Sequence, residues 1–258
     1  VFDFDQTLSV VHVFKALAGW LRVVPAVAPG AAARFPPVPP IPGPFASSEL
    51  GQVRRIAELN ERKEFRELGG FAAAAFGGPG RIQEVRALLQ TLKAKGCDLV
   101  ICTKGLVGVV QAILLDLELL DYFSQVYGHI GDSYGMTAYD LQVAKQGPIS
   151  LTTYAGLLGL AEQANWGGSK ERLVAELMRQ QGLRHHEAVL VEDDPEEIRR
   201  ARAICRTCFV SEARGITREH MDQLIFMSEQ CGQDKPAVAS LMGMQPSQIC
   251  LRKSGGAP

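Results

Sequence analysis

The sequence has no surplus of charge of either sign and no uninterrupted hydrophobic run of membrane-spanning length. Its 27 basic and 28 acidic side chains leave a formal net charge of -1, so the charge does not indicate a nucleic acid or an anionic membrane as partner. The longest apolar stretch, residues 10–27, is interrupted by His12, Lys15, Arg22 and Pro25. A membrane helix needs about 18 apolar residues in succession. These absences favour a globular protein that binds neither nucleic acid nor membrane.

The six cysteines lack the dense, regular spacing of a disulfide scaffold. Reduced thiols, and therefore a cytoplasmic protein, are the favoured interpretation. Cys205 and Cys208 have the two-residue gap of a redox or zinc half-site, but they lie between a predicted helix and a predicted strand, where nothing acidifies a thiol. Because the sequence starts at Val1 without Met and already inside a predicted strand, we expect the natural chain to begin upstream, which leaves localisation open.

Strands and helices alternate along much of the sequence, which has no internal repeat. Such alternation predicts an α/β fold with a parallel sheet and helices on both of its faces. At 258 residues, the chain is long enough for one α/β domain with an insertion, or for two small domains. Strands are predicted at 1–4, 98–102, 125–130, 188–191 and 207–210. Helices are predicted from 81 to the turn at 95, and at 106–120, 170–181, 196–205 and 215–227.

The segment between the first strand and the regular part of the sequence is different in character. Helices are predicted at 10–23 and 47–68, and the proline-rich stretch 25–44 between them is predicted to be a linker or mobile loop. Residues 131–148 resemble a loop, and 149–165 fit either a strand or a short helix. We therefore expect a core made of residues 1–8 and 78–215, and an insertion at 9–77. Residues 216–258 are expected to form a closing helix followed, from 230, by a loose tail.

The most informative chemistry lies at the end of the first strand, where Asp3 and Asp5 are two residues apart and Thr7 follows. Residues two apart on a strand point to the same side, so the two charges would repel each other unless the backbone turns or a cation lies between them. One carboxylate could act as a nucleophile while the other exchanges protons. A turn pair at a strand end is the alternative.

Two further predicted strands also end in polar residues, Thr103 on one, and Asp193 with Asp194 on the other. The carboxyl ends of parallel strands lie along one edge of the sheet, where such folds bind ligands. The segment from Thr103 to Gly105, with Lys104 between them, is predicted to be a loop whose amides start a helix and suit an oxyanion such as phosphate. The carboxylates favour a hard cation such as Mg2+.

Taken together, these motifs make the chain resemble the haloacid dehalogenase (HAD) superfamily of hydrolases, in its phosphatase-type members. The first family motif, Asp-x-Asp-x-Thr, matches Asp3, Asp5 and Thr7. The second matches Thr103, and the third, a lysine at a helix start, matches Lys170. The fourth, an acidic cluster, matches Asp193 with either Asp194 or Glu197. The resemblance covers residues 1–8 and about 81–210.

The resemblance implies a Rossmann-like core with a small helical cap inserted after the first strand. It also implies that Asp3 is the nucleophile, which becomes a phospho-aspartate, and that Asp5 protonates the leaving group and then activates water. Thr103 and Lys170 would hold the phosphoryl oxygens. Mg2+ would be bound by the carboxylate of Asp3, the main-chain carbonyl of Asp5, and Asp193.

Several assignments stay open at this level. Lys104 is a further phosphate-binding candidate, and both Lys104 and Lys145 compete with Lys170 for the third motif. Asp194 fits a metal-site or supporting role as well as the N-cap of the helix after Pro195, and Glu197 could simply complement the dipole of that helix. Glu192 stands where many family members have glycine, so its carboxylate could lie near the metal or point away from it.

The function implied is a Mg2+-dependent phosphatase acting on a small phosphorylated metabolite. Asp5 disfavours a dehalogenase, because true dehalogenases lack an aspartate at that position. A phosphomutase or a protein phosphatase would use the same motifs. A catalytically silent scaffold, with residues 36–44 docking to an aromatic groove, is the alternative from another class.

Overall fold

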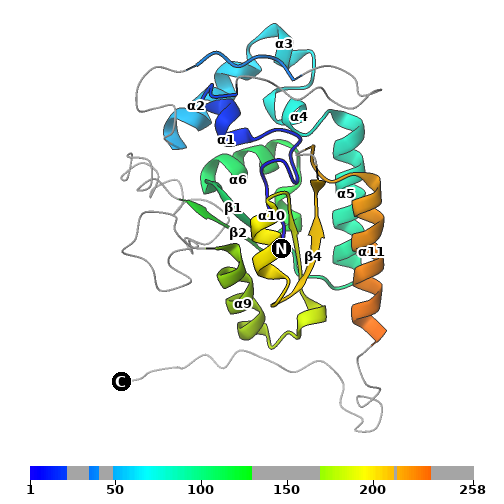
Figure 1. Cartoon of the computed structure of the whole chain (residues 1–258). Helices are drawn as coiled ribbons and strands as arrows, with labels where there is room; N and C mark the ends of the chain where they lie inside the picture. Colours follow the sequence, from blue (N-terminus) through cyan, green and yellow to red (C-terminus); the bar gives the residue numbers. More distant parts are fainter. Residues whose placement is uncertain (22–34, 41–48, 130–168, 212–213, 234–258) are drawn as a thin grey trace, which may run out of the picture.

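The computed structural model describes residues 1–21, 35–40, 49–129, 169–211 and 214–233 (Figure 1). It confirms the predicted parallel sheet, with strands β1 (Val100–Leu106) and β2 (Gln125–His129) paired in parallel, and β3 (Val189–Glu192) and β4 (Arg206–Phe209) paired in parallel. Phe2 forms a parallel bridge to Ile101 of β1 and another to Val191 of β3. The spatial order is therefore β2, β1, the segment at Phe2, β3 and β4.

The amino-terminal segment occupies the centre of this sheet through its main chain. The amide of Phe2 donates to the carbonyl of Val100 at 2.8 Å, and the amide of Asp3 donates to the carbonyl of Val191 at 2.9 Å. In return, the amide of Cys102 donates to the carbonyl of Phe2 at 2.9 Å. Because the segment has neighbours on both sides, Asp3 emerges at the carboxyl edge between β1 and β3.

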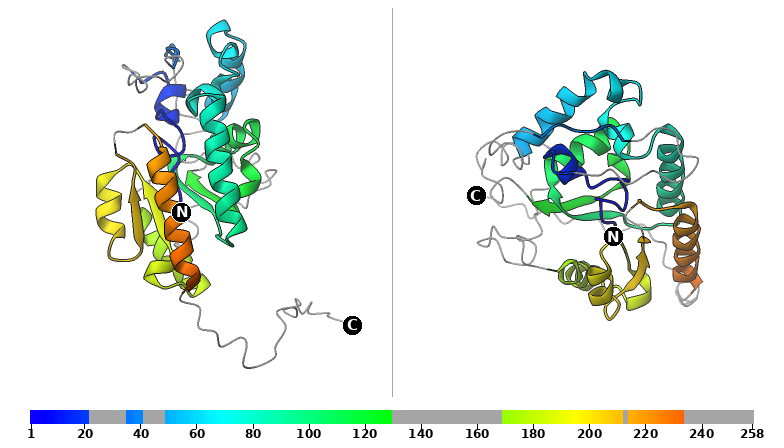
Figure 2. Two further views of the ribbon diagram at one scale, coloured as in Figure 1. Left: turned by 90° about the vertical axis from the view of Figure 1, so that its right-hand side faces the viewer. Right: turned by 45° about the horizontal axis from the view of Figure 1, so that its top comes forward.

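Helices cover both faces of the sheet (Figure 2). Alternate strand residues separate into two sets, as the period of two in a strand requires. Ile101, Val126 and Val191 pack with α5 (Pro79–Ala94), α6 (Val107–Asp116) and α11 (Arg218–Gln233). Val100 and Leu190 belong to the opposite face, which is covered by α9 (Lys170–Gln181) and α10 (Pro195–Ala201). The short 3-10 turns η2 (Leu120–Tyr122) and η4 (His185–Glu187) precede β2 and β3.

The described part of the insertion forms four helices that lie together beyond the carboxyl edge of the sheet, at the top of Figure 1. They are α1 (Val13–Leu17), α2 (Glu49–Asn60), α3 (Lys63–Arg66) and α4 (Phe71–Ala75). Phe35 is buried against Phe65 and Phe71, with ring centroids 5.5 and 5.7 Å away. Residues 35–40 have neither helix nor strand, which agrees with the predicted linker or loop, but the ring of Phe35 anchors the start of this segment. The rest of 25–44 lies outside the described residues.

Two predicted helices of the insertion are shorter in the structure. The helix predicted at 10–23 spans only Val13–Leu17, and Gly19 follows at φ +71, where a Cβ would lie 2.3 Å from the Cα of Pro40. The helix predicted at 47–68 is interrupted at Arg62, whose backbone is extended with φ -76 and ψ 137. Gly69 and Gly70, at φ +85 and +100, end this region as predicted.

Strand β1 is longer than predicted. It continues past Cys102 to Leu106, and the register shifts between these residues, so the segment from Thr103 to Gly105 is an irregular part of the strand and not a loop that starts a helix. A bulge of this kind keeps the chain in the sheet while it redirects side chains. Helix α6 begins only at Val107.

Other boundaries differ at helix ends. Helix α10 ends at Ala201, not at 205, and α11 continues to Gln233, so the tail is helical for three residues beyond Gln230. The predicted loop at 131–148, which includes Lys145, and the predicted strand or short helix at 149–165 lie outside the described residues. Within the part of the chain that the structure describes, no helix has both the length and the apolar character needed to cross a membrane.

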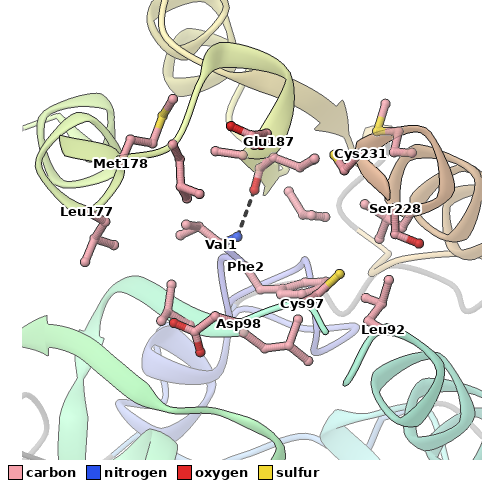
Figure 3. A pocket seen from close by; sticks show the side chains of 18 of the residues that line it. Val1, Phe2, Leu92, Cys97, Asp98, Leu177, Met178, Glu187, Ser228 and Cys231 are labelled. Atoms are coloured by element: carbon pink, nitrogen blue, oxygen red, sulfur yellow. Dashed lines mark hydrogen bonds between the residues drawn. The ribbon is translucent and has the colours of Figure 1, made fainter. Parts of the chain in front are cut away.

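A pocket of about 330 Å³ lies at the amino-terminal edge of the sheet, opposite Asp3 (Figure 3). The amino group of Val1 donates to the carbonyl of Val189 there, at 2.8 Å. Side chains from both helical layers line it, Leu177 from α9 and Cys231 from α11 among them. Because the polar strand ends lie at the other edge, this pocket is not part of the site described below.

Candidate active site at the carboxyl edge of the sheet

Asp3 and Asp5 diverge because the chain leaves the sheet after Phe4. Asp3 keeps the sheet hydrogen bond to Val191, whereas Asp5 and Gln6 belong to a turn. Gln6 has φ 61, in the left-handed region that residues other than glycine rarely adopt. The backbone turns between the two carboxylates, which was one of the two solutions that their spacing allowed, but the charge of Asp5 still adds to the effect of burial in raising the pKa of Asp3.

Lys170 lies directly beside Asp3. It is the first residue of α9, is 2% exposed, and its ammonium group donates to Oδ1 of Asp3 and, at 2.6 Å, to Oε2 of Glu192. Burial alone would lower the pKa of Lys170, but the neighbouring Asp3 and Glu192 raise it above its usual value. Lys170 therefore stays charged beside Asp3, and it begins α9, the helix start at which the third motif was expected.

Three carboxylates gather around this lysine. Asp3, Glu192 and Asp193 each offer one oxygen, and these atoms lie within 4.8 Å of one another. Burial raises the pKa of Asp3 to about 6, against the opposing effect of Lys170. Burial, together with the charge of Asp3, raises the pKa of Glu192 to about 8, and burial also raises the pKa of Asp193. One ammonium group does not balance these carboxylates, and their hard oxygen donors fit Mg2+.

The side chain of Asp5 faces the insertion. Its Oδ1 accepts hydrogen bonds from the amides of Val13 at 2.5 Å and Phe14 at 3.4 Å, at the start of α1. Nδ1 of His12 lies 3.4 Å from the same oxygen. The second carboxylate of the first motif is therefore oriented by residues of the insertion, not of the core.

Thr103 lies on the other side of Asp5, with Gly105 between them. The hydroxyl of Thr103 is buried and accepts a hydrogen bond from the amide of Gly105 at 2.9 Å. A Cβ at position 105 would lie 3.2 Å from the Thr103 hydroxyl and 3.5 Å from Oδ2 of Asp5. Only glycine leaves the space between these two groups open.

The remaining predicted residues surround this centre. Thr7 donates to Asp193 at 3.4 Å. Asp194 accepts from the amide of Glu196 at 2.9 Å and so caps α10, which is one of the two roles that the sequence left open. Glu197 is buried and does more than complement the helix dipole, since it accepts from the amide of Lys170 at 2.9 Å.

Lys104 is oriented toward the start of α10. Its ammonium group lies 3.0 Å from Glu197 and 3.5 Å from Asp194, and the side chain is half-exposed. Burial alone would lower the pKa of Lys104, but the hydrogen bond that its ammonium group donates to Glu197, together with the charges of Glu197 and Asp194, raises it. Of the two candidate lysines that the structure describes, Lys170 and not Lys104 is in contact with Asp3.

Two contacts could not be read from the sequence. The sequence left the direction of Glu192 open, and it gave His12 no role, because both depend on which strand and helix ends meet in space. Cys205 and Cys208 are both buried, and burial raises the pKa of Cys205 and that of Cys208, the latter to about 11, so neither thiol is acidified.

The fold and this site define a Rossmann-like α/β protein whose charged residues converge at the carboxyl edge of a parallel sheet. The model of the haloacid dehalogenase-like hydrolase family matches residues 1–204, which is most of the chain. The chain belongs to this family and is a hydrolase of the HAD superfamily. A search of the curated proteins finds no match.

Proposed function

We propose that the protein is a Mg2+-dependent phosphatase that hydrolyses a phosphate monoester through a phospho-aspartate intermediate. The observation that carries this proposal is the buried contact between Asp3 and Lys170 within a cluster of carboxylates. A carboxylate held beside a fixed positive charge, at the edge where such sheets bind ligands, is suited to attack an electrophilic phosphorus.

The residues divide the chemistry between them. Asp3 attacks phosphorus, and Lys170 with the Thr103 hydroxyl offsets the negative charge that develops on the phosphoryl oxygens. Asp5 gives a proton to the leaving oxygen and later removes one from the attacking water. Asp3, Asp193 and the main-chain carbonyl of Asp5 would hold Mg2+, with Glu192 as an added oxygen donor. Bound there, Mg2+ supplies charge neutralisation for the phosphoryl group.

The position of the insertion supports a small substrate. Its helices lie beyond the carboxyl edge, and α1 supplies the amides that bind Asp5 (Figure 1). We infer that the insertion is a cap that excludes water and limits the size of the substrate, which favours a phosphorylated metabolite over a phosphoprotein. The packing of Phe35 within the insertion weakens the scaffold alternative, because it anchors residues 35–40, the described part of the proline-rich stretch.

Release of inorganic phosphate from an aryl phosphate and from a broad panel of phosphate esters tests the proposal. We expect release with Mg2+, none with a chelator, and none from Asp3→Asn, which removes the nucleophile. Asp98→Asn is the matched control, because Asp98 is an exposed carboxylate at the opposite edge of the sheet and should keep full activity. If no ester of the panel is hydrolysed with Mg2+ present, the result contradicts the proposed function and favours the scaffold alternative.

A further inference from the structure

Arg81, in the first turn of α5, contacts both places where the chain crosses between core and insertion. Its guanidinium donates to the carbonyl of Leu8 at 2.7 Å, where the chain leaves the sheet, and to the carbonyl of Phe76 at 3.0 Å, where it returns. It also donates to the carbonyl of Ile216 at 3.2 Å, in the segment before α11. One side chain therefore joins three segments that are far apart in sequence.

The backbone around Arg81 is shaped to admit it. Gly77 has φ +82, and a Cβ there would lie 3.2 Å from Cδ of Arg81. Gly215 has φ +76, and a Cβ there would lie 2.3 Å from Nη2 of Arg81. Any side chain at 215 would occupy the place of the guanidinium. Both glycines therefore serve the same close approach.

The charge of Arg81 is compensated by carbonyl groups. Three carbonyl oxygens accept its hydrogen bonds, those of Leu8, Phe76 and Ile216. Burial lowers the pKa of Arg81 to about 10, so the group is still charged at neutral pH. A planar guanidinium with several fixed donors can bind three carbonyls at once, whereas the single ammonium group of a lysine cannot reproduce that geometry.

The segment joined by Arg81 also supports the turn that carries the first motif. The amide of Gly215 donates to the carbonyl of Gln6 at 2.9 Å, and the amide of Ile216 donates to the carbonyl of Thr7 at 2.7 Å. The two crossings are joined in addition by the amide of Val10, which donates to the carbonyl of Ala75 at 2.8 Å. Arg81 thus binds the segments whose hydrogen bonds hold the turn next to Asp5.

We propose that Arg81 is a positioning residue of the site, which fixes both crossings of the insertion and, through Leu8 and Ile216, the turn that carries Asp5 and Thr7. The structural part of this inference is independent of the reaction, and its catalytic consequence rests on the proposed function. Arg81 itself contacts neither the carboxylate cluster nor the lysine beside it.

Hydrogen exchange followed by mass spectrometry tests the structural part. The variants are Arg81→Met and Arg81→Lys, and the control is Arg86→Met. Arg86 is on the same helix and also binds main-chain carbonyls, those of Leu117 at 2.8 Å and Glu118 at 3.2 Å, but it is remote from the crossings. We expect about tenfold faster exchange in peptides covering residues 5–13 and 74–78 for both Arg81 variants, and unchanged exchange there for the control.

Steady-state kinetics test the catalytic part. Arg81→Lys should lower kcat about tenfold with KM within about twofold, because misplacement of Asp5 affects the chemical step more than binding. Arg81→Lys keeps the charge and the aliphatic stem, so it carries the test if the methionine variant does not fold. Exchange at 5–13 equal to that of the control would overturn the inference. An inactive wild-type protein would refute the proposed function, while the exchange data would still decide the role of Arg81.

Discussion

The individual residues of the site are notable for their imbalance of charge. Lys170 lies among Asp3, Glu192 and Asp193, and this lysine and two of the acids are almost completely buried. Such a group must take up either protons or a cation, because buried charges of one sign repel each other strongly in a medium of low polarity. The raised pKa values of Asp3 and Glu192 describe the uptake of protons, and binding of Mg2+ would be the uptake of a cation.

This imbalance predicts how stability depends on pH. Burial raises the pKa of Asp3 to about 6 and that of Glu192 to about 8, so the folded protein keeps protons that the unfolded chain releases near pH 4. Without metal, the contribution of these groups to stability is present below about pH 4 and is lost as the pH rises through about 6 and about 8. Mg2+ should reverse the trend, because it binds the deprotonated carboxylates.

Thermal unfolding with Mg2+ or a chelator measures this effect. The Mg2+ concentration needed for a given rise in Tm should fall about tenfold from pH 6 to pH 7, since one proton is released as the metal binds. Glu192→Gln removes the group that carries this proton. The Mg2+ concentration that this variant needs should therefore change much less between pH 6 and pH 7. An Mg2+ requirement that is independent of pH in the wild type would contradict the prediction.

Among the secondary-structure elements, the close pairing of β1 and β2 sets the position of Thr103. A Cβ at Gly128 of β2 would lie 2.9 Å from the carbonyl oxygen of Gly105 and 2.9 Å from Cγ2 of Thr103. Neither atom is the end of a flexible side chain, so relief would require the two strands to move apart. The irregular end of β1 therefore depends on glycine in the neighbouring strand.

Gly128→Ala should accordingly destabilise the protein by about 1 to 3 kcal/mol, the usual cost of inserting a methyl group into a packed interior. It should also lower activity, because Thr103 would be displaced. Gly80→Ala is the control, since a Cβ at that position in α5 has no atom within 4 Å and should raise stability by up to about 1 kcal/mol. Urea unfolding measures both, and equal stability of the two variants would contradict the prediction.

The elements that could be predicted from the sequence are those with strong local patterns. Helix α9 begins at Lys170 and ends at Gln181, as the spacing of its apolar residues predicted, and Gly182 follows in the left-handed conformation. The extension of β1 to Leu106 could not be predicted, because it depends on pairing with β2. The contacts of Asp5 with α1 and of Arg81 with three carbonyls were equally hidden, since each depends on how distant segments meet.

In the whole molecule, the core and the insertion share one hydrophobic interior. Phe4, at the end of the central segment, packs against Phe76 at the end of the insertion, with ring centroids 5.9 Å apart. The same cluster continues to Phe65 and Phe35 in the insertion and to Leu89 in α5. Because one continuous cluster of buried side chains includes residues of both the core and the insertion, we expect the two parts to unfold together.

Phe35→Ala tests this expectation. Removing a buried aromatic ring should cost about 3 to 5 kcal/mol and lower the Tm of a single transition. Phe226→Ala is the control, because that ring is 58% exposed on α11 and its loss should change stability by less than about 0.5 kcal/mol. Calorimetry distinguishes the outcomes. A separate early transition in Phe35→Ala would show that the insertion unfolds independently.

The left-handed backbone of Gln6 has a consequence for the order of folding. A residue other than glycine at φ 61 costs about 1 kcal/mol, which opposes the local hydrogen bonds of the turn, such as that from the amide of Ser9 to the carbonyl of Phe4 at 3.0 Å. The turn is further stabilised by partners from far along the chain, such as the amide of Gly215, which donates to the carbonyl of Gln6. We therefore expect the sheet to assemble first and the catalytic geometry to form last, so that during refolding the capacity to bind Mg2+ appears after the secondary structure.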